Sequence, residues 1–199
     1  NDESVFKINN FIFKLFYKLF NQLKKTFFYS GKVYVSFNHF NTKFILKEIN
    51  ESDFDIVNLH WIGGEMISID EIMMINKNIV WTFHDMWPFL GIHHYEQYKY
   101  NLLNKSIEKY FLSKKNILSK KKINIIFPST WMKDKFFDYD TFKENKSEII
   151  NYPINSNYWK RNKLINKYNF VFHKNRYYLL FLSNSGENDH RKGFSKLKK

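Results

Sequence analysis

Short apolar runs of about strand length alternate with longer amphipathic segments through most of this sequence. Runs rich in Val, Ile, Phe and Tyr that are bounded by Gly, Pro or Asn are typical of strands, whereas longer amphipathic segments are typical of helices. We therefore expect strands at residues 32–37, 54–61, 79–83, 123–127, 147–150 and 177–182, and a less regular extended segment at 44–48. We expect helices at 5–28, 65–76, 101–119 and 130–137, the last with Ser129 as its N-cap.

This alternation of strands and helices predicts an α/β protein with a parallel, doubly wound sheet. A polar segment near residues 155–175 precedes the last expected strand and is the best candidate for a domain boundary. We therefore expect an N-terminal domain over residues 1–165 and the beginning of a second domain over residues 166–199.

The expected helix at residues 5–28 is apolar around most of its circumference. At 100° per residue, Lys7, Lys14, Lys18 and Lys25 fall on one narrow arc, and phenylalanines occupy the opposite side. Two interpretations stay open. The segment is either a core helix with one solvated stripe, or an amphipathic helix that lies on an anionic membrane surface.

The chain of 199 residues has a formal net charge of +13, which favours anionic partners: nucleic acid, an anionic membrane surface or phosphorylated small molecules. Arginine, the side chain best suited to reading bases, occurs only at positions 161, 176 and 191, so we expect no nucleic-acid partner. The absence of cysteine excludes disulfides and thiolate metal sites. We expect a cytoplasmic protein, either free or bound peripherally at the inner face of the plasma membrane.

Ionisable side chains follow two of the expected strands at the point where each strand ends. The apolar run at residues 79–83 is followed by His84 and Asp85, and the preceding strand ends in His60 and Trp61. Ligands of α/β proteins bind beyond the carboxyl ends of the strands, and these ends share one edge of the sheet. We therefore favour His84 as a hydrogen-bonding group for a polar ligand, with a satisfied core histidine as the alternative.

A metal centre at this edge is disfavoured, although His93 and His94 could add ligands to His84 and Asp85. The sequence contains neither His-x-x-x-His nor His-Glu-x-x-His, the spacings that place metal ligands on one helix face. Trp61 and Trp87 have flat apolar faces suited to sugar rings or bases, but tryptophan is equally common in cores.

A second candidate site follows the last expected strand. Arg191, Lys192 and Gly193 stand where a helix is expected to begin, and cations beside a glycine at such a junction are suited to phosphate. A solvated pair of charges is the alternative interpretation. The fingerprints of P-loops and of dinucleotide-binding folds do not occur in the sequence.

Taken in order, several segments resemble the family 4 glycosyltransferases of the colanic-acid (WcaC-like) branch. The resemblance covers about residues 52–199 and rests on residues 55–62, 80–89, 127–132 and 189–194, together with Gly91, His94 and Tyr95. It implies a GT-B architecture, in which two Rossmann-like domains enclose the active site. It also implies retaining, metal-independent transfer of a sugar from a nucleotide-sugar to a glycan or lipid-linked acceptor in bacterial surface polysaccharide assembly.

The same resemblance implies roles for individual residues. His84 matches the catalytic histidine that approaches the donor sugar, and Arg191, Lys192 and Gly193 match the site of the donor diphosphate. The residues matched to the acceptor side of the cleft are His60, Trp61, Asp85, Trp87, His94 and Tyr95. No cofactor or metal is implied. The alternative function is a basic module that binds membranes or nucleic acid without catalysis.

The sequence also departs from the family pattern. The glycine-rich loop that follows the family's first strand has no counterpart, Asn155 stands where an Asp is usual, and a Glu-containing donor motif would lie beyond residue 199. We therefore expect a fragment: a first domain incomplete at its N-terminal end and the first strand and turn of a second. We expect this fragment to be inactive alone.

Overall fold

The computed structural model describes residues 18, 19, 22, 35–41, 43–96, 102–159, 173, 175–183 and 192–198. The chain divides into two compact units, residues 1–152 and 153–199. The expected domain limits at 165 and 166 stay a prediction. Apart from residues 18, 19 and 22, which are helical, the expected helix at 5–28 lies outside the described residues.

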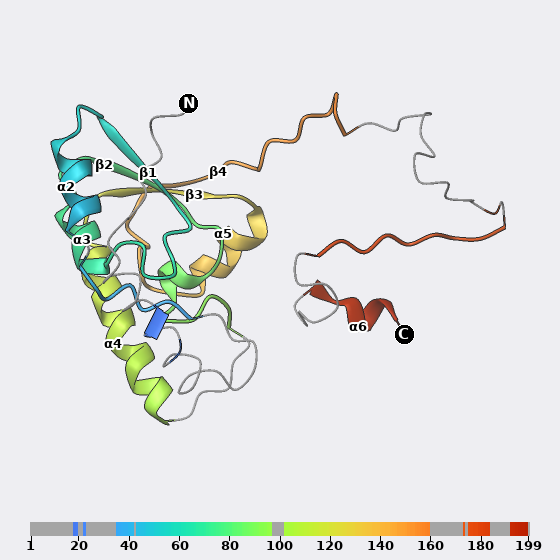
Figure 1. Ribbon diagram of the computed structural model, residues 1–199, viewed down its shortest axis with the longest axis horizontal. Helices are drawn as coiled ribbons and strands as arrows, with labels where there is room; N and C mark the ends of the chain where they lie inside the picture. The colour runs from blue at the N-terminus through green and yellow to red at the C-terminus, as the bar shows by residue number, and fades with distance from the viewer. Residues whose placement is uncertain are drawn as a thin grey trace. The chain divides into compact units, whose positions relative to one another are not determined.

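In the part of the first unit that the structure describes, four parallel strands form a sheet (Figure 1). They are β1 (Ile56–His60), β2 (Asn78–Thr82), β3 (Ile123–Phe127) and β4 (Ser147–Ile149). Their spatial order, β1-β2-β3-β4, is also their order in the chain. The sheet confirms the predicted α/β class with parallel strands, and each of the four strands falls at a predicted position.

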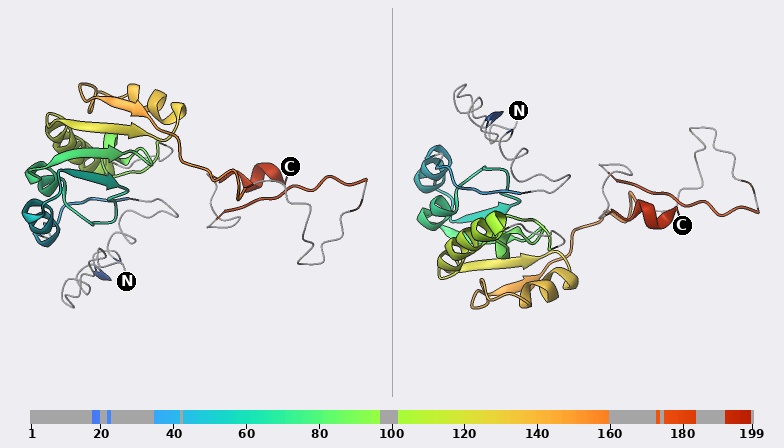
Figure 2. Two further views of the ribbon diagram at one scale, coloured as in Figure 1. Left: turned by 90° about the horizontal axis from the view of Figure 1, so that it is seen from above. Right: turned by 90° about the horizontal axis from the view of Figure 1, so that it is seen from below.

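The helices of the first unit connect and flank these strands. They are α2 (Phe44–Glu51), α3 (Ile69–Met74), the 3₁₀ turn η1 (Trp87–Phe89), α4 (Leu102–Leu118) and α5 (Thr130–Phe137). Figure 1 shows α3, α4 and α5 on one side of the strands, and the second view in Figure 2 shows α4 in front of the sheet. Right-handed crossovers between strands in sequential order require this arrangement. Among the described strands the order does not reverse, as it would in a doubly wound sheet.

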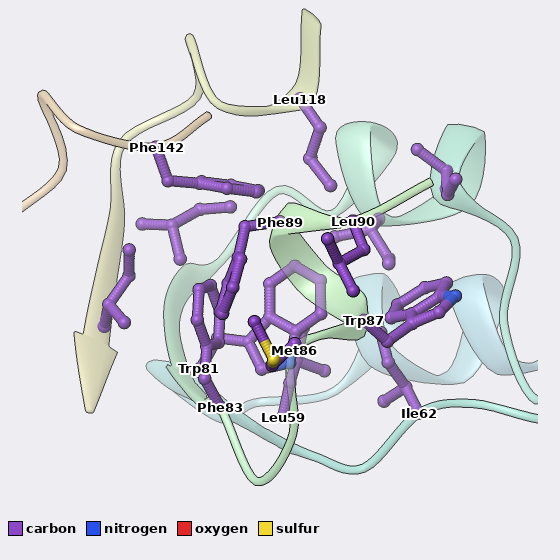
Figure 3. Close-up of a cluster of buried hydrophobic side chains, with 14 of the residues drawn as sticks. Leu59, Ile62, Trp81, Phe83, Met86, Trp87, Phe89, Leu90, Leu118 and Phe142 are labelled. Atoms are coloured by element: carbon purple, nitrogen blue, oxygen red, sulfur yellow. The ribbon is translucent and has the colours of Figure 1, made fainter. Parts of the chain in front are cut away.

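The hydrophobic core lies between the sheet and these helices. Trp81 of β2 and Phe83 just after it are almost completely buried, and their rings meet edge to face with centroids 5.1 Å apart. Phe89 of η1 and Phe142 pack against Phe83, as part of the cluster drawn in Figure 3. This packing fixes the end of β2 and therefore the position of His84, the next residue.

Three predicted segments were wrong in detail. Residues 44–48, expected to be extended, belong to α2, where Ile45 and Ile49 stand one turn apart and pack against the core. Residues 35–37, the described part of the strand expected at 32–37, form only one isolated antiparallel bridge, from Val35 to His93. Residues 177–182 form no strand; five of their six side chains are exposed, since no described strand pairs with them.

Candidate active site

Two histidines meet at the carboxyl edge of the sheet. His60 is the last residue of β1, and His84 comes two residues after the end of β2. The strands are parallel and pair His60 with Thr82, so both chain ends leave the sheet side by side. The Nδ1 atom of His60 lies 2.8 Å from Nε2 of His84. The structure thus brings together two side chains that the sequence places at separate strand ends.

Tyr152 completes this group, although the sequence analysis does not single it out as a site residue. Its hydroxyl is hydrogen-bonded to Nδ1 of His84. The two rings are nearly parallel, with centroids 5.6 Å apart and 5° between their planes. The sequence signal that could have indicated Tyr152 is its position after β4. The carboxyl end of β4 reaches the same edge of the sheet as the carboxyl ends of β1 and β2.

The surroundings of His84 favour its neutral form. Partial burial is the main cause that lowers the pKa of His84 below its usual value of 6.5, and the neighbouring His60 lowers it further, against the opposite effect of Asp85. Burial and the Asp85 carboxylate raise the pKa of Tyr152, so its hydroxyl stays protonated. The edge therefore carries a neutral imidazole and a neutral phenol at pH near 7.

Asp85 organises the loops beneath this edge. Its carboxylate accepts hydrogen bonds from Trp61 Nε1 at 3.1 Å, from His94 Nδ1 at 2.6 Å and from the backbone N–H of Trp87 at 3.0 Å. Because a carboxylate only accepts, the proton of the His94 bond is on Nδ1. Asp85 is buried, so it acts on the site through the side chains it holds.

The hydrogen bonds continue from His94 into the loop that follows β1. Nε2 of His94 lies 2.9 Å from Ser36 Oγ, which accepts from the backbone N–H of Gly64 at 2.8 Å. A Cβ atom on Gly63 would stand only 3.0 Å from His94 Cε1. The order Ser-His-Asp has the form of a hydrolytic triad, but both Ser36 and His94 are buried. A substrate carbonyl has no access to this serine, and the group orders the loop instead.

Trp61 is an exposed aromatic side chain of the site. Its backbone has φ of +35°, a left-handed value that is strained for a residue with a large side chain. The hydrogen bond from its indole N–H to Asp85 holds the side chain in this position, and 41% of the residue is exposed. The buried Asp85 carboxylate thus keeps the exposed Trp61 side chain in one orientation.

Trp87 and His94, predicted to line the cleft, are buried at 2% exposure each. The Trp87 indole N–H donates to the carbonyl of Ser36 at 2.7 Å, so this tryptophan supports the site from inside. The cause is the turn η1, which directs Trp87 into the core. The other matched residues are His60 and Trp61, which are exposed, Tyr95, which is half-buried, and Asp85, which is buried.

Lys115 of α4, which sequence reasoning missed, is completely buried beneath the loop of residues 87–91. Its ammonium donates to the carbonyls of Trp87, Leu90 and Gly91, the last two at 2.8 and 2.7 Å, and stands 3.6 Å from the centroid of the Trp87 ring. Burial holds the pKa of Lys115 well below its usual value, against the attraction of Glu108 and Asp85. The sequence signal is weak: a lysine between Phe111 and Leu118 on the apolar face of the helix.

Glu108, also on α4, holds the same loop from another side. Its carboxylate accepts from the backbone N–H groups of Gly91 and Ile92, at 2.8 and 2.6 Å, and lies 2.9 Å from Nδ1 of His93. A Cβ atom on Gly91 would come within 2.2 Å of the Glu108 carbonyl, so only glycine allows this approach. Burial alone would raise the pKa of Glu108, but these hydrogen bonds lower it overall.

The residues matched to the donor diphosphate belong to the second unit. Lys192 is exposed, and Gly193, with φ of +75°, precedes the short helix α6 (Phe194–Leu197). Arg191 lies outside the described residues. Within the described parts of the chain, no group of three or more histidine or acidic side chains could hold a metal ion. No described helix is long and apolar enough to cross a membrane.

A parallel α/β sheet with polar side chains at its carboxyl edge is the form of a Rossmann-like domain of the GT-B type. The sequence model of Glycosyltransferase Family 4 matches residues 18–158, more than half of the chain. The chain therefore belongs to Glycosyltransferase Family 4. Comparison with curated proteins and with solved structures gave no match.

Proposed function

We propose that this chain forms the acceptor side of a glycosyltransferase that moves a sugar from a nucleotide-sugar to a glycan or lipid-linked acceptor. The pathway we propose is bacterial surface polysaccharide assembly: exopolysaccharide, capsule or lipopolysaccharide. The family match supports sugar transfer in general. We infer the position of the site from one observation, the hydrogen-bonded pair of His60 and His84 at the carboxyl edge of β1 and β2.

In this proposal His84 and its partners orient the reacting sugar, and the exposed ring of Trp61 supplies an apolar face for a sugar. We assign the half-buried Tyr95 to the acceptor side as well, on the family resemblance. The leaving nucleoside diphosphate needs positive charge, which Arg191 and Lys192 supply in a reaction that uses no metal and retains configuration. Asp85 holds the Trp61 indole by a hydrogen bond, and His94 and the backbone N–H of Trp87 bond to the same carboxylate.

Binding measurements test the proposal. Isothermal titration of the purified chain with UDP-glucose and GDP-mannose, as representative nucleotide-sugars, should show weak binding that His84→Ala and Lys192→Ala each reduce at least about tenfold, a loss of about 1.4 kcal/mol. Lys143→Ala, an exposed lysine of the first unit, is the matched control and should bind as the parent chain does. Equal binding by all four proteins would overturn the assignment. Glycosyl transfer by the 199-residue chain alone would overturn its proposed inactivity.

A peripheral position at the inner face of the plasma membrane is part of the proposal, because a lipid-linked acceptor would be there. Residues 5–28 would contact the anionic surface through their lysines. Sedimentation with liposomes that contain increasing fractions of phosphatidylglycerol should carry down increasing amounts of the chain. Sedimentation that does not change with anionic lipid would contradict this part, as would no sedimentation at all.

A further inference from the structure

Both ring nitrogens of His84 are already hydrogen-bonded within the chain. Nε2 faces Nδ1 of His60 at 2.8 Å, and Nδ1 is bonded to the hydroxyl of Tyr152. Among the described residues, the side chains of His60 and Tyr152 have no hydrogen-bond partner other than His84. Both residues are exposed. The three side chains therefore form a linear chain of hydrogen bonds with His84 at its centre and two ends open to solvent.

Such a chain has a direction, because a neutral imidazole has one N–H donor and one bare nitrogen. Its surroundings lower the pKa of His84, so the ring is neutral near pH 7 and cannot donate from both nitrogens. The groups that face it are His60 from β1, Asp85 from its own loop and Tyr152 from the segment after β4. If Tyr152 donates to Nδ1, the His84 proton is on Nε2 and points to His60; if His84 donates to Tyr152, every bond reverses.

The first direction is favoured by the acidity of the donors. A phenol has an ordinary pKa near 10 and is a much better hydrogen-bond donor than a neutral imidazole N–H. The bare nitrogen of an imidazole is in turn a better acceptor than a phenol oxygen. The Tyr152 hydroxyl therefore donates to His84 Nδ1, His84 Nε2–H donates to His60 Nδ1, and His60 is left with its own proton on Nε2.

We propose that Tyr152 is a positioning residue that fixes His84 in the tautomer protonated on Nε2. The near-parallel packing of the two rings holds the hydroxyl in line with Nδ1. As a consequence, the exposed end of the chain at His60 presents an N–H donor, and a sugar hydroxyl that approaches it meets a donor for its oxygen. This inference rests on the proposed role of His84 in sugar transfer.

Nitrogen NMR of the histidine rings tests the proposal without any ligand. In long-range ¹H–¹⁵N spectra of the labelled full chain, at a pH above the histidine range, His84 and His60 should both appear as the Nε2–H tautomer. His84→Ala and His60→Ala assign the two rings by loss of their signals. Tyr152→Phe removes only the hydroxyl, and it should shift His84 toward a mixture of tautomers, with Nδ1–H now donating to water.

Tyr110→Phe is the matched control, since Tyr110 is exposed on α4 in the same unit and its ring packs against Phe111. Tyr152 is 56% exposed, so the Phe variant should keep the amide spectrum of the sheet, which checks the fold. His84 protonated on Nδ1 in the parent chain would overturn the proposal, as would a His84 spectrum unchanged by Tyr152→Phe. These outcomes do not depend on nucleotide-sugar binding, so the tautomer assignment and the proposed function fail separately.

Discussion

At the scale of single residues, the carboxylate of Asp85 connects more of the site than any histidine does. It accepts from a backbone N–H, from the indole of Trp61 and from His94. Asp85→Asn should lower the free energy of unfolding by about 2 kcal/mol. The side-chain amide would place its own N–H against one of the three N–H donors, and the other hydrogen bonds would lose their charged acceptor. Urea unfolding measures this, with the exposed Asp134→Asn as the control; equal midpoints would contradict it.

Lys115 gives a second prediction at this scale. Lys115→Met keeps an unbranched side chain, one atom shorter than that of lysine, but leaves three carbonyls of residues 87–91 without their donor. We expect a loss of about 2 kcal/mol or more in unfolding free energy, since buried unpaired carbonyls are costly. Lys109→Met, on the exposed side of α4, should change stability by less than about 0.5 kcal/mol. If the two variants are equally stable, the ammonium does not support the loop.

The residues of the site differ in how far the sequence can reveal them. His60 and His84 can be predicted because strand ends are visible as apolar runs that stop at ionisable side chains. Lys115 and Tyr152 cannot, because their partners are 24 to 28 and 68 positions away and depend on how helices and strands pack. For the same reason Trp87 could be matched to the cleft by its motif and still be buried.

At the scale of elements, local signals decided which segments could be predicted. The helix at 130–137 was predicted with its limits, because Ser129 follows Pro128 and precedes an unbroken helical segment. Residues 44–48 were predicted as a less regular continuation of the strand expected at 32–37, although their apolar residues do not alternate; the packing of Ile45 and Ile49 against the core makes them helical. Residues 177–182 are an apolar run that pairs with no described strand, so a strand signal in the sequence was not enough to make them one.

The cap of α5 provides the prediction at this scale. Ser129 Oγ accepts from the backbone N–H of Met132 at 3.2 Å, and α5 places Met132 and Phe136 in the core. Ser129→Ala should cost about 1 kcal/mol of stability, and Ser129→Asp should restore most of it, since aspartate also caps. Thermal unfolding followed by circular dichroism measures both. A stable Ala variant would mean that packing alone holds the start of α5.

At the scale of the whole molecule, two buried or partly buried groups link stability to pH with the same sign. Folding lowers the pKa of His84 from 6.5 and that of Glu108 from 4.5. As pH falls, the unfolded chain therefore takes up these protons at a higher pH than the folded chain does. The stability that these two groups contribute is therefore full above about pH 7, declines as pH falls through the range just below the ordinary histidine pKa, and declines again as Glu108 becomes protonated. Urea midpoints over this range should fall in these two stages.

Glu108→Gln separates the two stages. The amide keeps the shape of the side chain but has no charge, so the variant should be less stable than the parent near neutral pH. Because the amide cannot be protonated, the variant should lose less stability than the parent below about pH 4.5. The decline attributed to His84 should persist in this variant, because His84 lies at the sheet edge with different partners. If the acid decline of the variant matches that of the parent, Glu108 does not cause it.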